Sequence, residues 1–226
     1  MADIQEFYSN YTSPVYDSTP AFLQQDFLFP YVQGKDFVES LIDKGGWEAV
    51  DQAYLDPPVS TEQILHPENY PNDAPIKVVL PDFLPILGEG WREVERNTMG
   101  EWYTYLTLAF GDDPAARLDD QEAKNAAEGW GGDEYLVYYN DDNATSAMVL
   151  KYEWDNDREA RQFNQAFKSY ASNRFGKPVV DSPGLIGWEA SEGYTAFHSS
   201  GNQSTWILAP DAATAEALWV ALQAAG

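Results

Sequence analysis

The sequence contains no cysteine and only two histidines, His66 and His198. The absence of cysteine excludes disulfide bonds, thiolate metal ligands and a thiol nucleophile, and it fits either an oxidising or a reducing compartment. The two histidines stand far apart in the sequence and do not form the i, i+4 pair of a helical zinc site. His198 follows Ala196 and Phe197 in a strand pattern, and we interpret it as a surface or edge residue. We therefore expect no complete metal site and no cofactor site within this chain.

Long apolar runs are missing as well, since no stretch approaches the roughly 20 residues that span a bilayer. The N-terminal MADIQEFYSNYTSP has neither the basic region nor the apolar core of an export signal. We expect a soluble protein without membrane insertion. Its compartment stays open, because an N-terminal truncation would remove a leader and would place the intact protein outside the cytoplasm.

Basic residues are scarce, since 13 lysines and arginines face 37 aspartates and glutamates, for a formal net charge of −24. A field of this sign repels nucleic acid and anionic lipid, so neither is an expected partner. Adjacent acidic residues such as Asp141 and Asp142 lack the spacing of a calcium-binding loop and are typical of turns and helix N-caps. A Gly-x-Ser-x-Gly elbow and a phosphate-binding glycine-rich loop are also absent.

The 226 residues are 44% hydrophobic and 15% aromatic, which is enough to bury a substantial core. Apolar periodicity and capping residues in the first third predict four short helices, over residues 18–29, 31–44, 47–54 and 61–65. Pro30 and the Gly45-Gly46 pair are the expected breaks between them. Helices this short stabilise one another by packing, so we expect a small helical array.

The rest of the chain contains both helical and strand periodicity. The pattern predicts a strand over 76–80, helices near 101–110 and 115–130, a hairpin over 134–154, a helix over 157–176, three strands within 185–210 and a last helix capped by Asp211. The inward face of the helix over 157–176 is expected to hold Phe163, Ala166, Phe167 and Tyr170. This order indicates an α+β fold, a small helical array followed by an antiparallel sheet with helices packed on one face. We expect a mainly helical subdomain over residues 1–125 and an α+β domain over residues 126–226.

Residues 27–70 hold an unusual group of short motifs, including Tyr-x-x-Gly-x-x-Phe, Gly-Gly-Trp and PPVSTEQILHP. This segment resembles the region just downstream of the metal-binding helices in bacterial HExxH zinc metallopeptidase-like proteins of the gluzincin type. The matching residues are Tyr31, Gly34, Phe37, Gly45, Gly46, Trp47, Pro57, Pro58, Ser60, Thr61, Glu62, Gln63, Ile64, Leu65, His66 and Pro67. A looser resemblance continues through LGEGWREVERNTMGEW, GWGGDEYLVYY and KYEWDNDREARQF.

The resemblance implies roles for two residues. Tyr31 matches a tyrosine whose phenol stabilises the developing oxyanion in gluzincin peptidases, and His66 would line the same cleft. From the residues alone, Tyr31 equally fits an anchor at a helix start, and His66 fits a structural hydrogen-bonding residue. The His-Glu-x-x-His pair and the downstream glutamate that bind zinc are absent from the sequence. The resemblance therefore implies zinc only together with a missing N-terminal half.

Two functional hypotheses follow. In the first, the chain is not an enzyme by itself but the non-catalytic C-terminal portion of a gluzincin-like zinc metallopeptidase. It would form one wall of the cleft and an α+β module for substrate or partner, with the missing catalytic half or a peptide as its partners. In the second, it is a stand-alone soluble binding protein that recognises a peptide or a sugar through exposed aromatic side chains. The sequence leaves the oligomeric state open.

Overall fold

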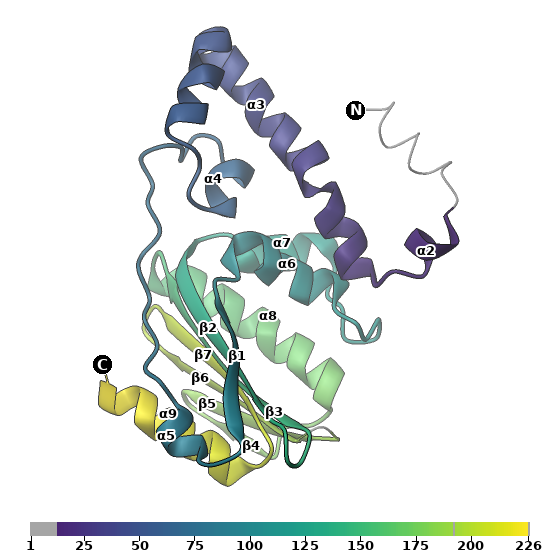
Figure 1. Ribbon diagram of the computed structural model, residues 1–226, viewed down its shortest axis with the longest axis vertical. Coiled ribbons are helices and arrows are strands. Elements are labelled where there is room, and N and C mark those ends of the chain that lie inside the picture. The colour runs from purple at the N-terminus through teal and green to yellow at the C-terminus, as the bar shows by residue number, and fades with distance from the viewer. Residues whose placement is uncertain (1–12, 192, 226) are drawn as a thin grey trace.

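The computed structural model describes residues 13–191 and 193–225. These residues form eight helices and seven strands, and all seven strands belong to one antiparallel sheet (Figure 1). The elements are α2 (Pro14–Asp17), α3 (Ala21–Leu55), α4 (Thr61–Leu65), α5 (Leu84–Leu87), β1 (Trp91–Asn97), α6 (Gly100–Phe110), α7 (Asp120–Ala127), β2 (Trp130–Asn140), β3 (Thr145–Trp154), α8 (Asp157–Phe175), β4 (Val180–Ser182), β5 (Leu185–Ala190), β6 (Gly193–Ser200), β7 (Gln203–Ala209) and α9 (Ala212–Ala225). The expected α+β class with an N-terminal helical region is confirmed.

The sheet has the strand order β1-β2-β3-β7-β6-β5-β4. The predicted hairpin is present, since β2 and β3 pair from Asn140 opposite Thr145 down to Trp130 opposite Trp154. At the centre of the sheet, β3 pairs with β7, which places Leu150 opposite Trp206. The short edge strand β4 was not predicted from the sequence. Successive side chains of each strand alternate between the two faces, so the central strands feed a core on both sides.

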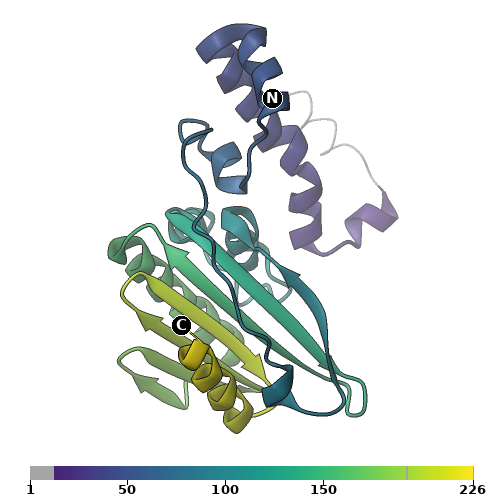
Figure 2. The ribbon, with the colours of Figure 1, turned by 60° about the vertical axis from the view of Figure 1, so that its left-hand side comes forward.

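Helices cover both faces of the sheet, so the expectation of helices on one face is wrong (Figure 2). On one face, α6, α7 and α8 pack against the Trp154 and Trp206 side. On the other face, α5 and α9 pack against Val149 and Ile207. The physical reason is that β3 and β7 are apolar at successive positions, and both apolar faces have to be removed from water.

The expected boundary after residue 125 is also corrected by the sheet. β1 precedes that boundary and pairs with β2, with Arg96 opposite Leu136. α6 precedes it as well and α7 spans it, yet both share one buried cluster with α8 and β3. Residues before and after position 125 therefore build one sheet and one core, because the apolar face of α8 needs the covering helices α6 and α7.

The N-terminal region is dominated by α3, which runs through Pro30 instead of ending there. Proline has no backbone N–H, so the helix loses one hydrogen-bond donor at this position. Aromatic contacts such as that of Phe29 with Trp102, whose ring centroids are 4.7 Å apart, hold the helix in place. The predicted break at Gly45-Gly46 is a kink, where Gly46 has φ +67. The predicted strand over 76–80 is not a strand, although Ile76 donates its N–H to the Gly131 carbonyl at 2.6 Å.

Several local predictions are confirmed. Ser60 caps α4, since its Oγ accepts from the Gln63 N–H at 3.2 Å. Asp211 caps α9 by accepting from the Thr214 N–H at 2.8 Å. The inward residues expected on α8 are all buried, namely Phe163, Ala166, Phe167 and Tyr170. Among residues 13–191 and 193–225, no helix combines the length and the apolar character that crossing a membrane requires.

Candidate functional site

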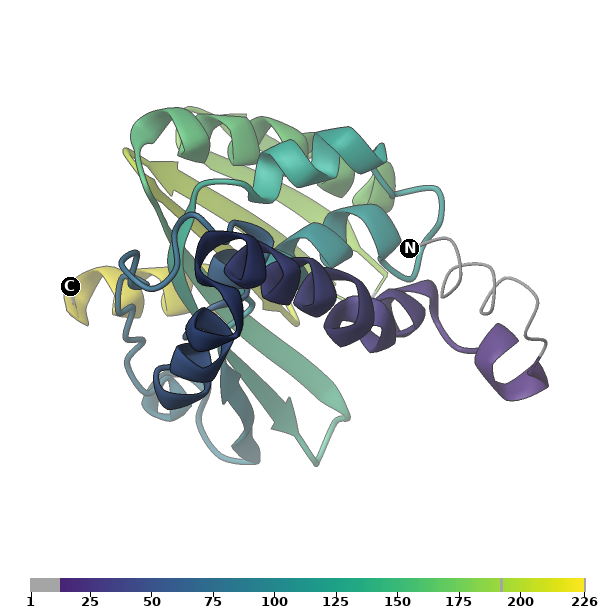
Figure 3. The same cartoon turned by 90° about the horizontal axis from the view of Figure 1, so that it is seen from above.

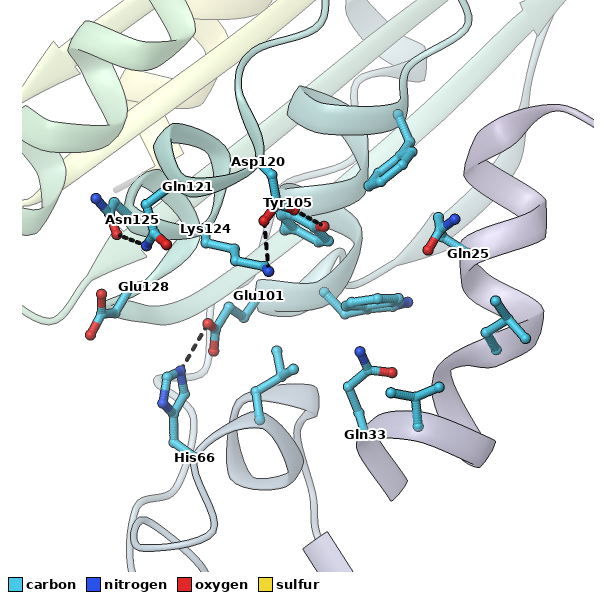
Figure 4. A pocket seen from close by; sticks show the side chains of 15 residues that line it. Gln25, Gln33, His66, Glu101, Tyr105, Asp120, Gln121, Lys124, Asn125 and Glu128 are labelled. Atoms are coloured by element: carbon cyan, nitrogen blue, oxygen red, sulfur yellow. Dashed lines mark hydrogen bonds and ion pairs between the residues drawn. The ribbon is translucent and has the colours of Figure 1, made fainter. Parts of the chain in front are cut away.

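A pocket of about 560 Å³ lies between the first half of α3, the end of α4, and helices α6 and α7 (Figure 4). Its polar lining includes His66 after α4, Glu101 on α6 and Gln33 on α3. Its walls come from segments that are far apart in the sequence. The pocket is therefore a product of tertiary packing, and its geometry has to be built up from the contacts that hold these helices together.

Asp133 of β2 fixes the start of α6. Its carboxylate accepts hydrogen bonds from the Met99 N–H at 2.8 Å, the Gly100 N–H at 2.9 Å and the Trp130 indole N–H at 2.7 Å. Burial raises the pKa of Asp133 to about 6, against the lowering effect of these three donors. A carboxylate at this position satisfies the free N–H groups of the first turn, so α6 and with it Glu101 are held directly against the sheet.

Thr61 joins α4 to the same turn of α6. Its Oγ1 accepts from the Trp102 N–H at 3.2 Å. Gly100 has φ +66, and a Cβ there would lie 2.7 Å from Thr61 Oγ1. Glycine is thus required both by the left-handed backbone and by the close approach of α4. The approach brings His66, which follows the last residue of α4, opposite Glu101.

His66 and Glu101 form the central pair of the pocket, with Nε2 of His66 2.9 Å from Oε1 of Glu101. The hydrogen bond to this carboxylate raises the pKa of His66 to about 9, so the imidazole is protonated near neutral pH. Glu101 is only 6% exposed. Burial raises the pKa of Glu101, and the contact with His66 opposes that shift. The pair therefore carries its proton on the imidazole as a charge-assisted hydrogen bond.

Two residues that line this pocket each have a buried oxygen atom without a hydrogen-bond partner among the described residues, Glu101 Oε2 and Gln33 Oε1. A second cluster beside them is satisfied. Asp120 accepts from the Tyr105 hydroxyl at 2.7 Å and from Lys124 Nζ at 2.8 Å. The pocket thus combines one paired carboxylate on α7 with one carboxylate on α6 that has an unused acceptor.

Helix α3 packs against α6 (Figure 3) and contributes one wall of the pocket. Asp26 accepts from the Trp102 indole N–H at 3.1 Å and from the Tyr103 hydroxyl at 3.3 Å. Phe22 adds a ring contact with Tyr103, at a centroid distance of 5.6 Å. These contacts use one side of α3, and the pocket residues Gln25, Leu28 and Val32 lie next to that side.

The opposite side of α3 is exposed and apolar. Leu23, Phe27, Pro30 and Tyr31 follow the helical spacing i, i+4, i+7, i+8, and we call them the outer stripe. Phe27 is 57% exposed and Tyr31 is 54% exposed. Tyr31 is therefore not part of the pocket lining, and its phenol lies on the far side of the helix from His66.

The two sequence-based candidates are thus separated by the structure. His66 lines the pocket and makes the hydrogen bond that its sequence context suggested. Tyr31 is in the outer stripe. His198, interpreted from the sequence as a surface or edge residue, is instead buried on the internal strand β6 and stacks on Trp219, with ring centroids 3.7 Å apart. Burial of the ring disfavours its charged form and lowers the pKa of His198 to about 4.

A second, acidic pocket of about 240 Å³ adjoins the first and shares His66 and Glu128 with it. Glu62 lies there and is 5% exposed. Burial, followed by repulsion from Asp155, raises the pKa of Glu62 to about 8. Within the part of the chain that the structure describes, no three histidine, aspartate or glutamate side chains are placed to hold a metal ion.

Glu101, Gln33 and Asp133 were not singled out from the sequence. Glu101 and Asp133 lie in the MGEW and GWGGDE parts of the looser resemblance, which was the available signal. Nothing in the spacing indicated that these parts would meet His66. Their meeting depends on the pairing of β2 with the start of α6 and on the contact between α4 and α6.

Residues 87–219 match the family described as Domain of unknown function (DUF8575), which is more than half of the chain. The chain belongs to the DUF8575 family. The match includes Glu101 and Asp133, whereas α3, α4 and His66 precede it. No curated protein and no solved structure matches the chain. The DUF8575 part therefore supplies the sheet and the α6–α7 side of the pocket, and the preceding helices supply the other side.

Proposed function

We propose that this DUF8575 protein is the non-catalytic C-terminal portion of a gluzincin-like zinc metallopeptidase, in which α3, α4 and the pocket form one wall of the cleft. The observation that carries the proposal is the position of the outer stripe. The helix with the Tyr-x-x-Gly-x-x-Phe motif binds α6 on one side and exposes Leu23, Phe27 and Tyr31 on the other.

The stripe has the periodicity of a helix face that packs against another helix. Exposed apolar groups gathered on one face are typical of interaction surfaces. In the proteins that the segment resembles, metal-binding helices come directly before this region. The occupant that we propose for the stripe is therefore the metal-binding half, and Tyr31 would face that half.

The chain would supply positioning and no metal ligand. Its sequence has no His-Glu-x-x-His, and His66 is already bound to Glu101 at 2.9 Å. The chemistry of peptide hydrolysis, in which a metal-bound water attacks the carbonyl, would come entirely from the other half. The role of this chain would be to hold the Tyr31 phenol at the interface and to present the pocket to a peptide.

The proposal is tested by mixing the chain with a separately expressed HExxH-bearing half from the same genome, with the complex followed by size-exclusion chromatography and calorimetry. We expect a one-to-one complex that Phe27→Asp and Tyr31→Asp weaken at least about tenfold, since each places a charge in an apolar contact. Val220→Asp is the matched control, because Val220 is 56% exposed on α9, away from the stripe. One zinc bound tightly by this chain alone, or casein cleavage that a chelator stops, would overturn the proposal.

A second candidate is a stand-alone protein that binds a peptide or a sugar through exposed aromatic rings. It is favoured by Trp47 and Tyr54, which are 70% and 84% exposed. All the exposed aromatic side chains within the described ranges lie on α3, whereas those of the sheet are buried or partly buried. Quenching of tryptophan fluorescence by a peptide or an oligosaccharide, lost in Trp47→Ala, would support this candidate, and no response across a ligand panel would oppose it.

A further inference from the structure

We propose that the pocket between α3, α4, α6 and α7 binds an organic cation, an alkylammonium or guanidinium group carried on an apolar stem. Three features of the pocket support this ligand class: two buried acceptors without donors, an excess of acidic groups around them, and apolar side chains along the walls. The proposal concerns the pocket side of α3, whereas the proposed function rests on the outer stripe.

The unused acceptors define what the ligand has to provide. Glu101 is 94% buried, its Oε1 is engaged by His66, and its Oε2 has no partner in the described part of the chain. Gln33 Oε1 is the second such atom, and Figure 4 shows Gln33 reaching into the pocket from α3, across from Glu101. A buried acceptor without a donor is destabilising, because it has lost its hydrogen bonds to water without replacement. Ammonium and guanidinium groups are pure donors, so either group can donate to such an atom without adding another acceptor.

The charges around the pocket favour a cation over a neutral donor. Glu101, Asp120 and Glu128 line the pocket, and the basic residues His66 and Lys124 are each bound to one of these carboxylates. The adjoining acidic pocket adds Glu68, Asp155 and Glu159. A recess with this excess of negative charge, in a molecule with a formal charge of −24, raises the local concentration of cations.

The walls fit the stem of such a ligand. The apolar side chains of Leu28, Val32 and Leu65 line the pocket. Trp102 and Phe110 add aromatic rings, which attract a cation over their faces. Lysine and arginine side chains bury their methylene groups along surfaces of this kind while their charged ends find acceptors. Two sources share this chemistry, the basic side chain of a peptide and a free polyamine, and the peptide source rests on the proposed function.

The test is calorimetric titration of the intact chain with four probes at low salt: Nα-acetyl-lysine amide, Nα-acetyl-arginine amide, the uncharged Nα-acetyl-norleucine amide, and spermidine. We expect the cations to bind and the norleucine derivative not to bind, with affinity that falls as salt is added. Binding of the amino-acid derivatives and not of spermidine would assign the ligand to peptides, and the reverse would assign it to polyamines. Cations that bind no better than the norleucine derivative would overturn the proposal.

Two variants locate the binding. Glu101→Gln should weaken cation binding by about 10- to 100-fold, the usual effect of losing a hydrogen bond to a charged group. Gln33→Leu should weaken it by about fivefold while leaving the melting temperature unchanged or higher, because it removes an unpaired buried acceptor. The control is Glu122→Gln, which makes the same charge change at an exposed position of α7 outside the pocket.

If Glu101→Gln does not fold, Gln33→Leu decides the question, because leucine keeps the size of the side chain. Cation affinities of Glu101→Gln and Gln33→Leu that equal that of Glu122→Gln would place the cation elsewhere and would overturn the proposal. The outcome is independent of the metal-binding half, since no titration includes it. Failure of the cation-binding proposal therefore leaves the outer-stripe proposal standing. Failure of the outer-stripe proposal likewise leaves cation binding by the pocket standing.

Discussion

Protonation of individual residues in this protein is set by burial and by one or two contacts. His66 and His198 begin from the same ordinary pKa, yet their environments shift them in opposite directions. The carboxylate of Glu101 stabilises the charged ring of His66, whereas stacking on Trp219 keeps the ring of His198 away from water. The two shifts have opposite consequences for stability as the pH changes.

The shifted pKa values of the two histidines predict how the stability of the protein depends on pH. The pKa of His66 rises from 6.5 to about 9 on folding, so its contribution is fully present below pH 6.5 and is lost as the pH rises to about 9. The pKa of His198 falls to about 4, so its contribution is present above pH 6.5 and is lost as the pH falls to about 4. Proton NMR of the two imidazole rings should show one midpoint near each value, and His66→Gln should remove the upper one. Two midpoints between pH 6 and 7 would contradict the geometry of both sites.

Glu62 gives a separate prediction, because burial raises its pKa from 4.5 to about 8. A raised carboxyl pKa means that stability falls as the pH rises from about 4.5 to about 8, when the buried group has to ionise. Glu62→Gln should therefore raise the free energy of unfolding above pH 8 by on the order of 1–3 kcal/mol. Urea unfolding at pH 5 and pH 8.5 measures the difference. Glu68→Gln, an exposed change in the same acidic pocket, should have little effect at either pH.

At the scale of elements, the site depends on how α4 and α6 meet. α6 is held at its first turn by Asp133 of β2, and α4 approaches that turn through Thr61. Neither contact follows from the apolar periodicity of α4 or α6. The same is true of α3, which continues through Pro30 because its contacts with Trp102 and Tyr103 outweigh the lost backbone hydrogen bond.

The meeting point of these helices predicts a non-additive double mutant. Gly100→Ala should cost more than the roughly 1–2 kcal/mol of a left-handed alanine, because its Cβ would also lie 2.7 Å from Thr61 Oγ1. In a Thr61→Ala background the cost should fall to the backbone penalty alone. Denaturant unfolding of the wild type, both single variants and the double variant gives the coupling energy. Strict additivity would show that α4 does not approach Gly100 as described.

At the scale of the whole molecule, one sheet joins the N-terminal and C-terminal parts of the chain. β1 and the pocket helices α6 and α7 share a core with α8, so the DUF8575 region from residue 87 onward is one structural unit. The full sequence carries a formal charge of −24. Self-repulsion of that charge opposes the compact state.

The repulsion predicts that salt stabilises the protein. Raising NaCl from 10 to 150 mM shortens the screening length from about 30 Å to about 8 Å. Screening should raise the free energy of unfolding by on the order of 1 kcal/mol, or the melting temperature by about 2–4 °C. Differential scanning calorimetry at pH 7.5 measures the shift. The same comparison at pH 4, where many carboxylates are protonated, is the control and should show a smaller change.

Much of the local structure was determined by the sequence itself. The capping by Ser60 and Asp211, the hairpin of β2 and β3 and the buried face of α8 follow from periodicity and capping residues, which act over a few positions. The kink at Gly45-Gly46 has the same origin, since only glycine adopts the backbone found at Gly46 without strain.

Only the tertiary structure decided the covering of both sheet faces, the passage of α3 through Pro30 and the composition of the pocket. Gln33 lies on α3, His66 follows the end of α4 and Glu101 lies on α6, and each is an ordinary residue in its own segment. What makes them a candidate site is the burial of Glu101 and the acceptors left unpaired when the helices close. Burial and pairing depend on which distant segments pack together, and packing is determined by the free energy of the whole fold and not by local sequence preference.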